Sequence, residues 1–251
     1  MALPIIIIMS AIKERLQHIQ DRITAAAARA GRDPAGITLV GVSKTWPVAD
    51  LLAAYEAGLR HFGENRPEEL AEKRPAIEAV LGPDSGLTWH HIGTVQSRKT
   101  NLVATHADYF HALDRLKIAQ RLAAQRPAGK PLPVLIEVNI SGEASKAGFA
   151  CQEWEANGSQ REMLVTAIQT IRELPNLELR GLMTMAPWDV PEAQIRAVFC
   201  RTRELATWLN ETIPDLALSD LSMGMSGDFE VAIEEGATLV RVGSAIFGYR
   251  R

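Results

Sequence analysis

Apolar residues recur along the chain in two patterns, one with the spacing of a helix and one typical of a strand. The first helical pattern covers about residues 11–31, where apolar positions are three or four apart: Ile12, Leu16, Ile19 and Ile23. The clearest strand pattern is the dense apolar run over residues 133–140. Segments of these two kinds alternate along the whole chain.

The alternation predicts eight strands separated by helix-like segments. We expect the strands at residues 37–44, 61–64, 89–93, 109–113, 133–140, 177–185, 221–225 and 238–247. Eight such units in 251 residues indicate an α/β protein built as a single (β/α)₈ TIM barrel. A doubly wound open sheet is the rival architecture, because alternation alone does not show closure. No linker divides the chain, so we expect one barrel domain over residues 11–251, preceded by an apolar N-terminal tail over residues 1–10.

The tail contains four consecutive isoleucines at positions 5–8. A signal peptide needs a basic start and a longer apolar core, and a membrane span needs about 20 apolar residues. Neither pattern is present, so we interpret the segment as an apolar tail or an extra strand that docks on the barrel.

Composition narrows the choice of partners. The 27 basic and 30 acidic side chains give a net charge of −3, which does not favour nucleic acid as a partner. The only two cysteines, Cys151 and Cys200, form no metal-binding pair or disulfide framework, as expected of a protein in a reducing cytosol. We therefore expect a cytoplasmic protein that binds neither nucleic acid nor membrane.

Lys44 is the most informative single residue, because it ends the predicted strand directly after an apolar run. A charged lysine there is costly unless it is paired or neutral. Burial lowers the pKa of a lysine, and a neutral amine can form a Schiff base with an aldehyde. The alternative is an ordinary surface lysine whose stem covers apolar surface. The run alone leaves both interpretations open.

The last two predicted strands are followed by glycine and serine residues. Barrels often bind a phosphate on the loops after strands seven and eight. Ser226 and Gly227 follow the seventh strand here, and Gly243 and Ser244 lie in the eighth segment. Glycines let backbone N–H groups approach a phosphate, and serine hydroxyls add donors. Two ordinary glycine turns are the alternative, but the coincidence of both positions favours a phosphate site.

Arg241 lies within an apolar strand pattern, on the same face as Gly243. A buried arginine stays charged and needs an acceptor. The structural candidate for that acceptor is a core carboxylate such as Glu137. The functional candidate is an unprotonated ring nitrogen or an anion.

The histidines show no metal-ligand spacing, and we expect no metal. His90 and His91 are adjacent on a predicted strand, so their side chains point to opposite faces and cannot form one metal site together. For His61, His106 and His111 a structural role is the simpler interpretation.

Taken together, these segments resemble the pyridoxal 5′-phosphate (PLP) homeostasis proteins, the YggS/PROSC group, over about residues 11–250. The matching segments are residues 42–45 (VSKT), 62–65 (FGEN), 89–93 (WHHIG), 137–140 (EVNI), 146–149 (KAGF), 181–185 (GLMTM), 221–226 (LSMGMS) and 240–244 (VRVGS). Each segment alone is weak evidence, whereas their combination is highly specific.

The resemblance implies a barrel like the N-terminal domain of alanine racemase (PLP fold type III) that carries PLP. It implies that Lys44 forms the Schiff base, that Arg241 faces the pyridine nitrogen and that Asn65 lies near the ring. It also implies that the phosphate is held by Ser226, Gly243 and Ser244. No catalytic residue is implied.

Two positions depart from the family pattern. Position 244 is often threonine, and Ser244 keeps the hydroxyl. His91 stands where an apolar residue is usual, and its role is open.

The resemblance favours a protein that binds, buffers and delivers PLP without robust catalysis. An arginine at the ring nitrogen weakens the electron sink on which PLP catalysis depends. Racemisation also needs a second base, which racemases of this type take from an additional β-domain that we expect to be absent. Tyr55 lies in a helix pattern and Tyr249 at the extreme C-terminus, and Tyr109 begins a strand, which is the wrong end of a barrel for catalysis. The resemblance further implies a monomer that serves PLP-dependent acceptor enzymes. The alternatives are a PLP-dependent amino-acid racemase and a sugar-phosphate barrel that uses Lys44 as an aldolase-type lysine.

Overall fold

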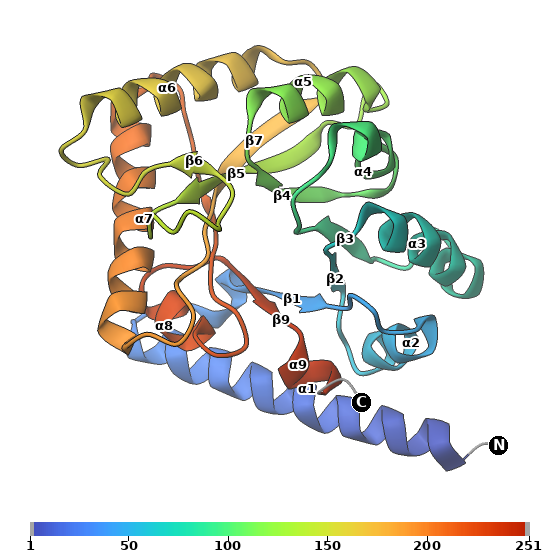
Figure 1. Ribbon diagram of the computed structural model, residues 1–251. Coiled ribbons are helices and arrows are strands. Elements are labelled where there is room, and N and C mark those ends of the chain that lie inside the picture. Colours follow the sequence, from blue (N-terminus) through green and yellow to red (C-terminus); the bar gives the residue numbers. More distant parts are fainter. Residues whose placement is uncertain (1–2, 249–251) are drawn as a thin grey trace.

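Eight parallel strands close into a barrel in the computed structural model, which describes residues 3–248 (Figure 1). The barrel strands are β1 (Thr38–Val42), β2 (His61–Glu64), β3 (Thr88–His91), β4 (Tyr109–Leu113), β5 (Leu132–Asn139), β7 (Leu177–Met183), β8 (Asp220–Ser222) and β9 (Leu239–Val242). They follow one another around the ring in the order β4-β3-β2-β1-β9-β8-β7-β5, and a β4–β5 pairing closes it. The predicted barrel is therefore confirmed and the open sheet is wrong. A two-residue strand, β6 (Phe149–Ala150), pairs with β5 outside the ring.

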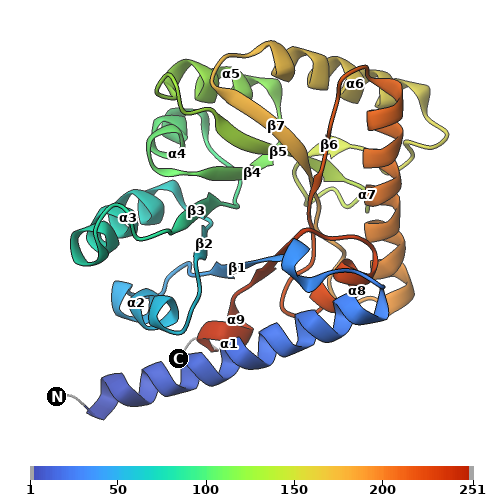
Figure 2. The same cartoon turned by 180° about the vertical axis from the view of Figure 1, so that it is seen from behind.

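Helices follow the strands and form the outer layer, which both ribbon views show (Figures 1 and 2). The α-helices are α1 (Leu3–Arg29), α2 (Val48–Glu56), α3 (Pro67–Leu81), α4 (Thr100–His106), α5 (Leu116–Gln125), α6 (Gly158–Glu173), α7 (Glu192–Thr212), α8 (Phe229–Glu234) and α9 (Ser244–Phe247). Two 3₁₀ turns, η1 (Pro34–Gly36) and η2 (Ser97–Lys99), complete the described part of the chain.

The helix α1 begins earlier than its apolar stripe predicts. Ile12, Leu16, Ile19 and Ile23 are all buried, as their spacing requires. Residues 3–10 continue the same helix, so the docking-strand interpretation is wrong for this segment. The division into an apolar tail and a barrel domain stays a prediction. Isoleucine is only slightly unfavourable in helices, and no glycine or proline separates residues 5–8 from Ile12. Pro4 is tolerated because it lies in the first turn. Residues 1 and 2 lie outside the described part of the chain.

Six of the eight barrel strands end earlier than predicted, whereas β2 and β4 end where predicted. β1 ends at Val42 rather than at residue 44, and β9 ends at Val242 rather than at residue 247. Residues 244–247 form α9, whose Ile246 and Phe247 are buried. A short apolar run cannot be assigned to strand or helix by its pattern alone, which explains the second error.

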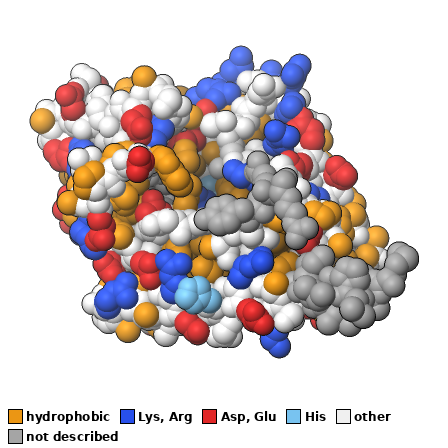
Figure 3. All heavy atoms as spheres, turned by 60° about the horizontal axis from the view of Figure 1, so that its bottom comes forward, with side chains coloured by type: hydrophobic (Ala, Val, Ile, Leu, Met, Phe, Trp, Pro, Cys, Tyr) orange, Lys and Arg blue, Asp and Glu red, His pale blue; other side chains and the backbone are white. Residues whose placement is uncertain are grey.

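The surface carries charges of both signs. On the face drawn in Figure 3, acidic and basic side chains are interspersed, in keeping with the net charge of −3. No helix within residues 3–248 combines the length and the apolar content needed to cross a membrane.

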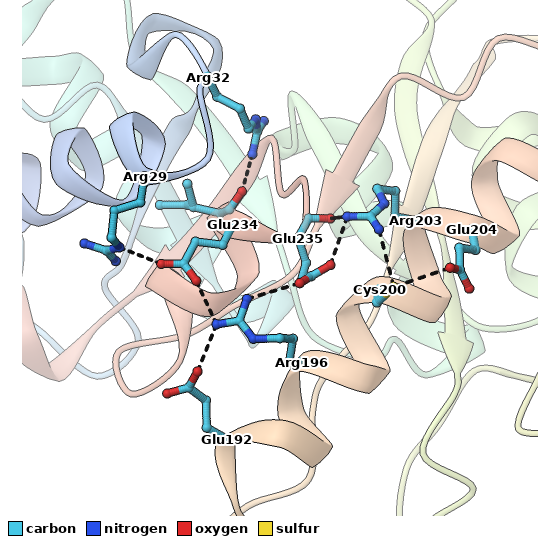
Figure 4. Close-up of polar contacts among 10 residues, drawn as sticks. Arg29, Arg32, Glu192, Arg196, Cys200, Arg203, Glu204, Glu234 and Glu235 are labelled. Carbon is cyan, nitrogen blue, oxygen red and sulfur yellow. Dashed lines mark hydrogen bonds and ion pairs between the residues drawn. The ribbon is translucent and has the colours of Figure 1, made fainter.

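A cluster of ion pairs joins α1, α7 and α8 on the outside of the barrel (Figure 4). Arg196 contacts Glu234 at 2.7 Å and Glu235 at 3.1 Å, and Arg203 contacts Glu235 at 2.9 Å. Arg29 from α1 contacts Glu234 at 2.7 Å. This α7–α8 ion-pair cluster fixes the end of α8, the helix that directly follows the loop containing Ser226.

The inside of the barrel is unusually polar. Barrel interiors are normally filled by branched apolar side chains. Here several polar or ionisable side chains are buried: His90, His111, Glu137, Ser222 and Arg241. Such a departure from apolar packing is expected where function constrains the sequence.

Candidate functional site

A cavity of about 640 Å³ opens at the carboxyl ends of the barrel strands, a volume suited to a small-molecule ligand. It is lined by residues at the ends of β1, β2, β3, β7, β8 and β9. All six residues predicted to bind the cofactor lie along this one cavity: Lys44, Asn65, Ser226, Arg241, Gly243 and Ser244. Barrel closure thus brings residues from the two ends of the chain to one place.

Lys44 lies in the turn that follows β1, with its half-buried side chain on the cavity. None of the hydrogen bonds or ion pairs found within residues 3–248 involves its Nζ. The next residue, Thr45, has a φ of 68°, a left-handed conformation that β-branched residues rarely adopt. Such a conformation costs about 1–3 kcal/mol and persists only where neighbouring groups hold it.

Five hydrogen bonds, three of them buried, hold the turn at Lys44 in place. The Thr45 N–H donates to Glu69 Oε2 at 2.6 Å, and Ser43 Oγ donates to Glu64 Oε1 at 2.7 Å. The Lys73 ammonium joins them, because Nζ donates to Ser43 O at 2.9 Å and to Glu64 and Glu69 carboxylates at 2.8 Å each. We call these five residues the Lys73 network. Sequence reasoning did not identify it.

The charges in the Lys73 network are largely shielded from water. The Glu64 side chain is 0 % exposed and that of Lys73 is 8 % exposed. Burial raises the pKa of Glu64, and the hydrogen bonds from Lys73 and Ser43 only partly offset this effect. Burial also opposes ionisation of Glu69, but hydrogen bonds from Lys73 and the Thr45 N–H prevail and lower the pKa of Glu69. The network therefore depends on Lys73 to compensate two carboxyl groups.

Arg241 forms part of the floor of the cavity. Its NH1 group donates to Ser222 O at 2.8 Å and to Ser222 Oγ at 2.6 Å, and NH2 donates to Thr184 O at 3.0 Å. Burial lowers the pKa of Arg241 to about 10, so the guanidinium remains charged at neutral pH. No hydrogen bond or ion pair in residues 3–248 joins Arg241 to Glu137, the structural acceptor considered above. The guanidinium thus keeps donors for a ligand in the cavity.

The loops after β8 and β9 meet beside Arg241. The Gly243 N–H donates to Ser226 Oγ at 3.3 Å, and the hydroxyls of Ser226 and Ser244 are 3.4 Å apart. These contacts are long, so both hydroxyls can turn towards an anion. Gly224 shapes the first loop, because its φ is 91° and a Cβ there would lie 2.6 Å from the Ala232 Cβ.

Asn65 enters the cavity from the end of β2. Its Oδ1 is buried without a hydrogen-bond partner among the described residues. Gly93 lets the end of β3 lie against it, since a Cβ at Gly93 would be 2.4 Å from Asn65 O. A buried acceptor without a partner is costly, so a donor on a ligand would stabilise this position.

Aromatic and methionine side chains complete the wall, and none of them was predicted. The Trp46 ring stacks on Phe247 with centroids 5.8 Å apart. Met185 and Met225 follow β7 and β8, so their place after predicted strands was the available signal. Trp188, on the loop before α7, is 82 % exposed at the cavity.

His90 and His91 point to opposite faces, as predicted. His90 is hydrogen-bonded to His61 and His111, whereas His91 stacks on Phe110 with ring centroids 5.7 Å apart. Burial lowers the pKa of His91 to about 4. Within residues 3–248, no group of three or more histidine, cysteine or acidic side chains is placed to hold a metal ion.

Comparisons with known proteins agree with this architecture. The family model described as alanine racemase, N-terminal domain, matches residues 14–251. The chain is 47 % identical over 243 residues to the pyridoxal phosphate homeostasis protein of Pseudomonas aeruginosa, covering 96 % of this chain and 97 % of that protein. It is 43 % identical over 246 residues to the protein of that name from Escherichia coli K12, with coverages of 96 % and 98 %.

Solved structures of other proteins have the same barrel fold. PipY of Synechococcus elongatus, in a structure with PLP bound, has a TM-score of 0.74 at 33 % identity, covering 94 % of this chain and 100 % of PipY. Alanine racemase from Corynebacterium glutamicum has a TM-score of 0.63 at 16 % identity, covering 96 % of this chain and 62 % of the enzyme. The second likeness shows the shared barrel alone.

Proposed function

The chain belongs to the alanine racemase N-terminal domain family, among the pyridoxal phosphate homeostasis proteins, and from this premise we propose that it binds PLP, buffers it and delivers it to acceptor proteins. In this proposal Lys44 attaches the cofactor covalently. Ser226, Gly243 and Ser244 hold its phosphate, Arg241 contacts its ring nitrogen, and Asn65 lies beside the ring. The observation that carries the proposal is one cavity lined by two serine hydroxyls, a buried arginine and a lysine whose amine has no partner among the described residues.

The residues present fit this cofactor. Two hydroxyls and a backbone N–H converge at the ends of β8 and β9, as an anionic phosphate requires. The unpaired Asn65 Oδ1 and the unused donors of Arg241 supply further polar contacts inside the same cavity. The Trp46 ring and two methionines provide apolar surface for an aromatic ligand.

The side chains of this site support binding more than catalysis. Bound PLP supplies an aldehyde that condenses with amines and a ring that withdraws electrons. Arg241 remains charged at neutral pH, so it donates a hydrogen bond but does not readily give up its proton. An acceptor nitrogen held by Arg241 stays unprotonated, which weakens electron withdrawal and therefore disfavours catalysis at amino-acid carbon atoms.

A second catalytic base is also missing from the described part of the cavity. Tyr109 lies at the opposite end of the barrel, where its hydroxyl donates to Asp220. The Tyr55 hydroxyl donates to Ser85 O at 3.2 Å, away from the cavity. Tyr249 lies outside the described residues. The relatives from Pseudomonas aeruginosa and Escherichia coli are likewise named as homeostasis proteins.

Three further expectations complete the proposal. The protein acts in the cytosol, where its free cysteines Cys151 and Cys200 stay reduced. It works as a monomer, and its protein partners are PLP-dependent enzymes that receive the cofactor through the open cavity.

The test is the absorption spectrum of purified protein loaded with PLP, before and after borohydride reduction, followed by mapping of the modified peptide. We expect visible absorption that reduction abolishes and a label on Lys44. Lys44→Ala should lose the absorption entirely. Lys44→Arg keeps the charge but cannot form the bond, and should lose it too. Lys117→Ala, at an exposed lysine away from the cavity, is the matched control and should bind like wild type.

The racemase alternative is tested by exchange of the α-proton of alanine in deuterated water. The proposal expects exchange no faster than with free PLP. Exchange at metabolic rates would replace the proposal with the racemase. A protein without a chromophore that traps a keto-sugar on borohydride reduction would favour the aldolase-type alternative.

A further inference from the structure

A chain of hydrogen-bonded side chains runs through the barrel from one end to the other. His61 Nδ1 lies 2.9 Å from His90 Nε2, and His90 Nδ1 lies 2.8 Å from His111 Nε2. His111 Nδ1 lies 2.8 Å from Ser222 Oγ, which accepts from Arg241 NH1 at 2.6 Å. Four strands contribute the histidines and the serine, and no link in this histidine chain exceeds 2.9 Å.

The histidine chain connects two openings of the barrel. His61 is half-buried and lines a cleft of about 370 Å³ near α1 and η1, at the amino ends of the strands. His90, His111 and Ser222 are at most 1 % exposed. Arg241, at the other end, lines the cavity at the carboxyl ends. The interior links therefore have no access to water except through the two end members.

Hydrogen-bonding rules and the available partners favour one direction for every link. An arginine can only donate, so Ser222 Oγ must accept from Arg241. Among the described residues, His111 Nδ1 is the one acceptor within hydrogen-bond distance of the Ser222 hydroxyl, so we assign the hydroxyl hydrogen to this link. His111 must in turn donate from Nε2 to His90 Nδ1, and His90 from Nε2 to His61 Nδ1. All three rings are neutral in this arrangement, each with its hydrogen on Nε2.

We propose that His111, His90 and His61 are positioning residues for Arg241, and that they couple the protonation of His61 to the cofactor cavity. The direction of the chain turns the lone pairs of Ser222 towards the guanidinium and so holds Arg241 in place. The effect on PLP rests on the proposed function, whereas the direction of the chain does not.

Protonation of His61 reverses this order. A proton on His61 Nδ1 would face the Nε2–H of His90, and two donors cannot remain 2.9 Å apart. His90 must then move its hydrogen to Nδ1, His111 must do the same, and the Ser222 hydroxyl receives donors from both sides. The hydroxyl hydrogen has to leave its place, which disturbs the contact with Arg241. Protonation of His61 at one end of the barrel thereby weakens the contact that holds Arg241 at the other end.

The charged and titratable groups around the chain are few. Arg60 is next to His61, and its guanidinium is bonded to Tyr55 O and Leu59 O. Tyr109 stacks on His90 and contacts His111. Its hydroxyl donates a hydrogen bond to Asp220, whose carboxylate lies 3.6 Å from Arg180 Nε. Each of these groups already has a hydrogen-bond or ion-pair partner. His61 is the one half-buried ring of the three, so protons from solvent reach it first.

The direction is tested by NMR of ¹⁵N-histidine-labelled wild-type protein without cofactor at pH 7.5. We expect His90 and His111 to carry hydrogen on Nε2 and an unprotonated Nδ1. A hydrogen on Nδ1 of either ring would overturn the assigned direction. This measurement needs no variant, so a failure to fold cannot obscure it, and it does not depend on PLP.

The coupling is tested with His61→Gln, which can still accept from His90 but cannot be protonated. PLP release is measured as the loss of visible absorption after dilution. For wild type we expect release to become about tenfold faster between pH 7.5 and pH 5.5, which corresponds to the free energy of about one net hydrogen bond. His61→Gln should show no such acceleration, while His18→Gln, at an exposed histidine of α1, should behave like wild type. Equal acceleration in His61→Gln and wild type would overturn the coupling. Failure of PLP to bind at all would instead refute the proposed function and leave the NMR result standing.

Discussion

Two buried polar networks support opposite sides of the cavity, and they are built in different ways. The Lys73 network lies between the barrel wall and α3 and holds the Lys44 turn with an ammonium and two carboxyl groups. The histidine chain lies inside the barrel and holds Arg241 with neutral rings and a hydroxyl. The first compensates charge with charge, whereas the second surrounds one charge with oriented dipoles.

The difference follows from what each network has to support. The strained conformation of Thr45 needs strong and localised acceptors, which a carboxylate provides. Arg241 must keep donors free for a ligand, and a carboxylate bonded to it would occupy them. Oriented neutral groups stabilise the guanidinium without occupying those donors. The lysine that we propose bonds PLP and the arginine that we propose contacts its ring thus depend on different electrostatics.

Removing the ammonium of the Lys73 network should have the largest effect. Lys73→Met leaves the buried Glu64 without its cation, and breaking a buried pair in this way costs about 3–5 kcal/mol of the free energy of unfolding. Urea denaturation at pH 7.5 measures the loss. Covalent loading of Lys44 should fall in parallel, because the turn loses its hydrogen bonds.

A double variant sharpens this result. Lys73→Met with Glu64→Gln removes both charges and should recover part of the lost stability. The surface pair of Lys99 and Glu68 supplies the control, and Lys99→Met should change stability by less than about 0.5 kcal/mol. A loss below about 1 kcal/mol for Lys73→Met would show that the network does not depend on its charge.

Acid should weaken the histidine chain next. Burial lowers the pKa of His90 and of His111 well below the usual value. The unfolded chain then binds more protons below about pH 6.5, so stability falls as pH falls through this range. For two histidines the loss is about 2 kcal/mol between pH 6 and pH 5. Urea unfolding across pH 5–8 measures it.

One histidine at a time separates this contribution from that of other groups. His90→Asn should lower the acid-dependent loss by about half of that amount, since one proton-binding ring is removed. His18→Gln removes an exposed ring and should leave the pH dependence unchanged. An unchanged pH dependence in His90→Asn would contradict a neutral buried chain.

The exposed ion pairs should matter least. Arg196→Ala opens the α7–α8 ion-pair cluster, in which the Arg196 side chain is 36 % exposed. The hydrogen bonds that Arg196 donates to Glu192, Glu234 and Glu235 raise the pKa of Arg196, yet solvent screening limits the loss of stability to about 1 kcal/mol or less. The loss should shrink further in 1 M salt. A loss as large as that of Lys73→Met would remove the contrast between buried and exposed charge.

Most of the fold could be predicted because it depends on short-range regularity. The spacing of Ile12, Leu16 and Ile19 is a property of neighbouring residues, and so is the alternation that gives eight strands. The boundaries failed where one residue decides the conformation. Thr45 ends the direction of β1 because it adopts a left-handed φ, a conformation that a threonine in the sequence does not predict. Residues 244–247 are apolar enough for a strand but form α9.

The cavity residues could be named through the resemblance, whereas their support could not. Lys73 lies four residues after Glu69 and looks like half of an exposed helical pair. Only the packing of α3 against β2 and β3, beside the turn at Ser43, buries it. His61, His90 and His111 are separated by 29 and 21 residues, so no local pattern joins them. Strand order and register bring their rings together, and both are properties of the closed barrel.

Closure also determines when the barrel can be completed during synthesis. β1 pairs with β9 from Thr38↔Leu239 to Gly41↔Val242, and Arg15 of α1 donates to Ile246 O near the other end of the chain. During synthesis, β1 therefore cannot pair with β9 until residues 239–242 have left the ribosome. Contacts of such long sequence separation also slow refolding. A chain that stops before residue 239 would keep β1 and β8 as open edges, ready to pair with another nascent chain.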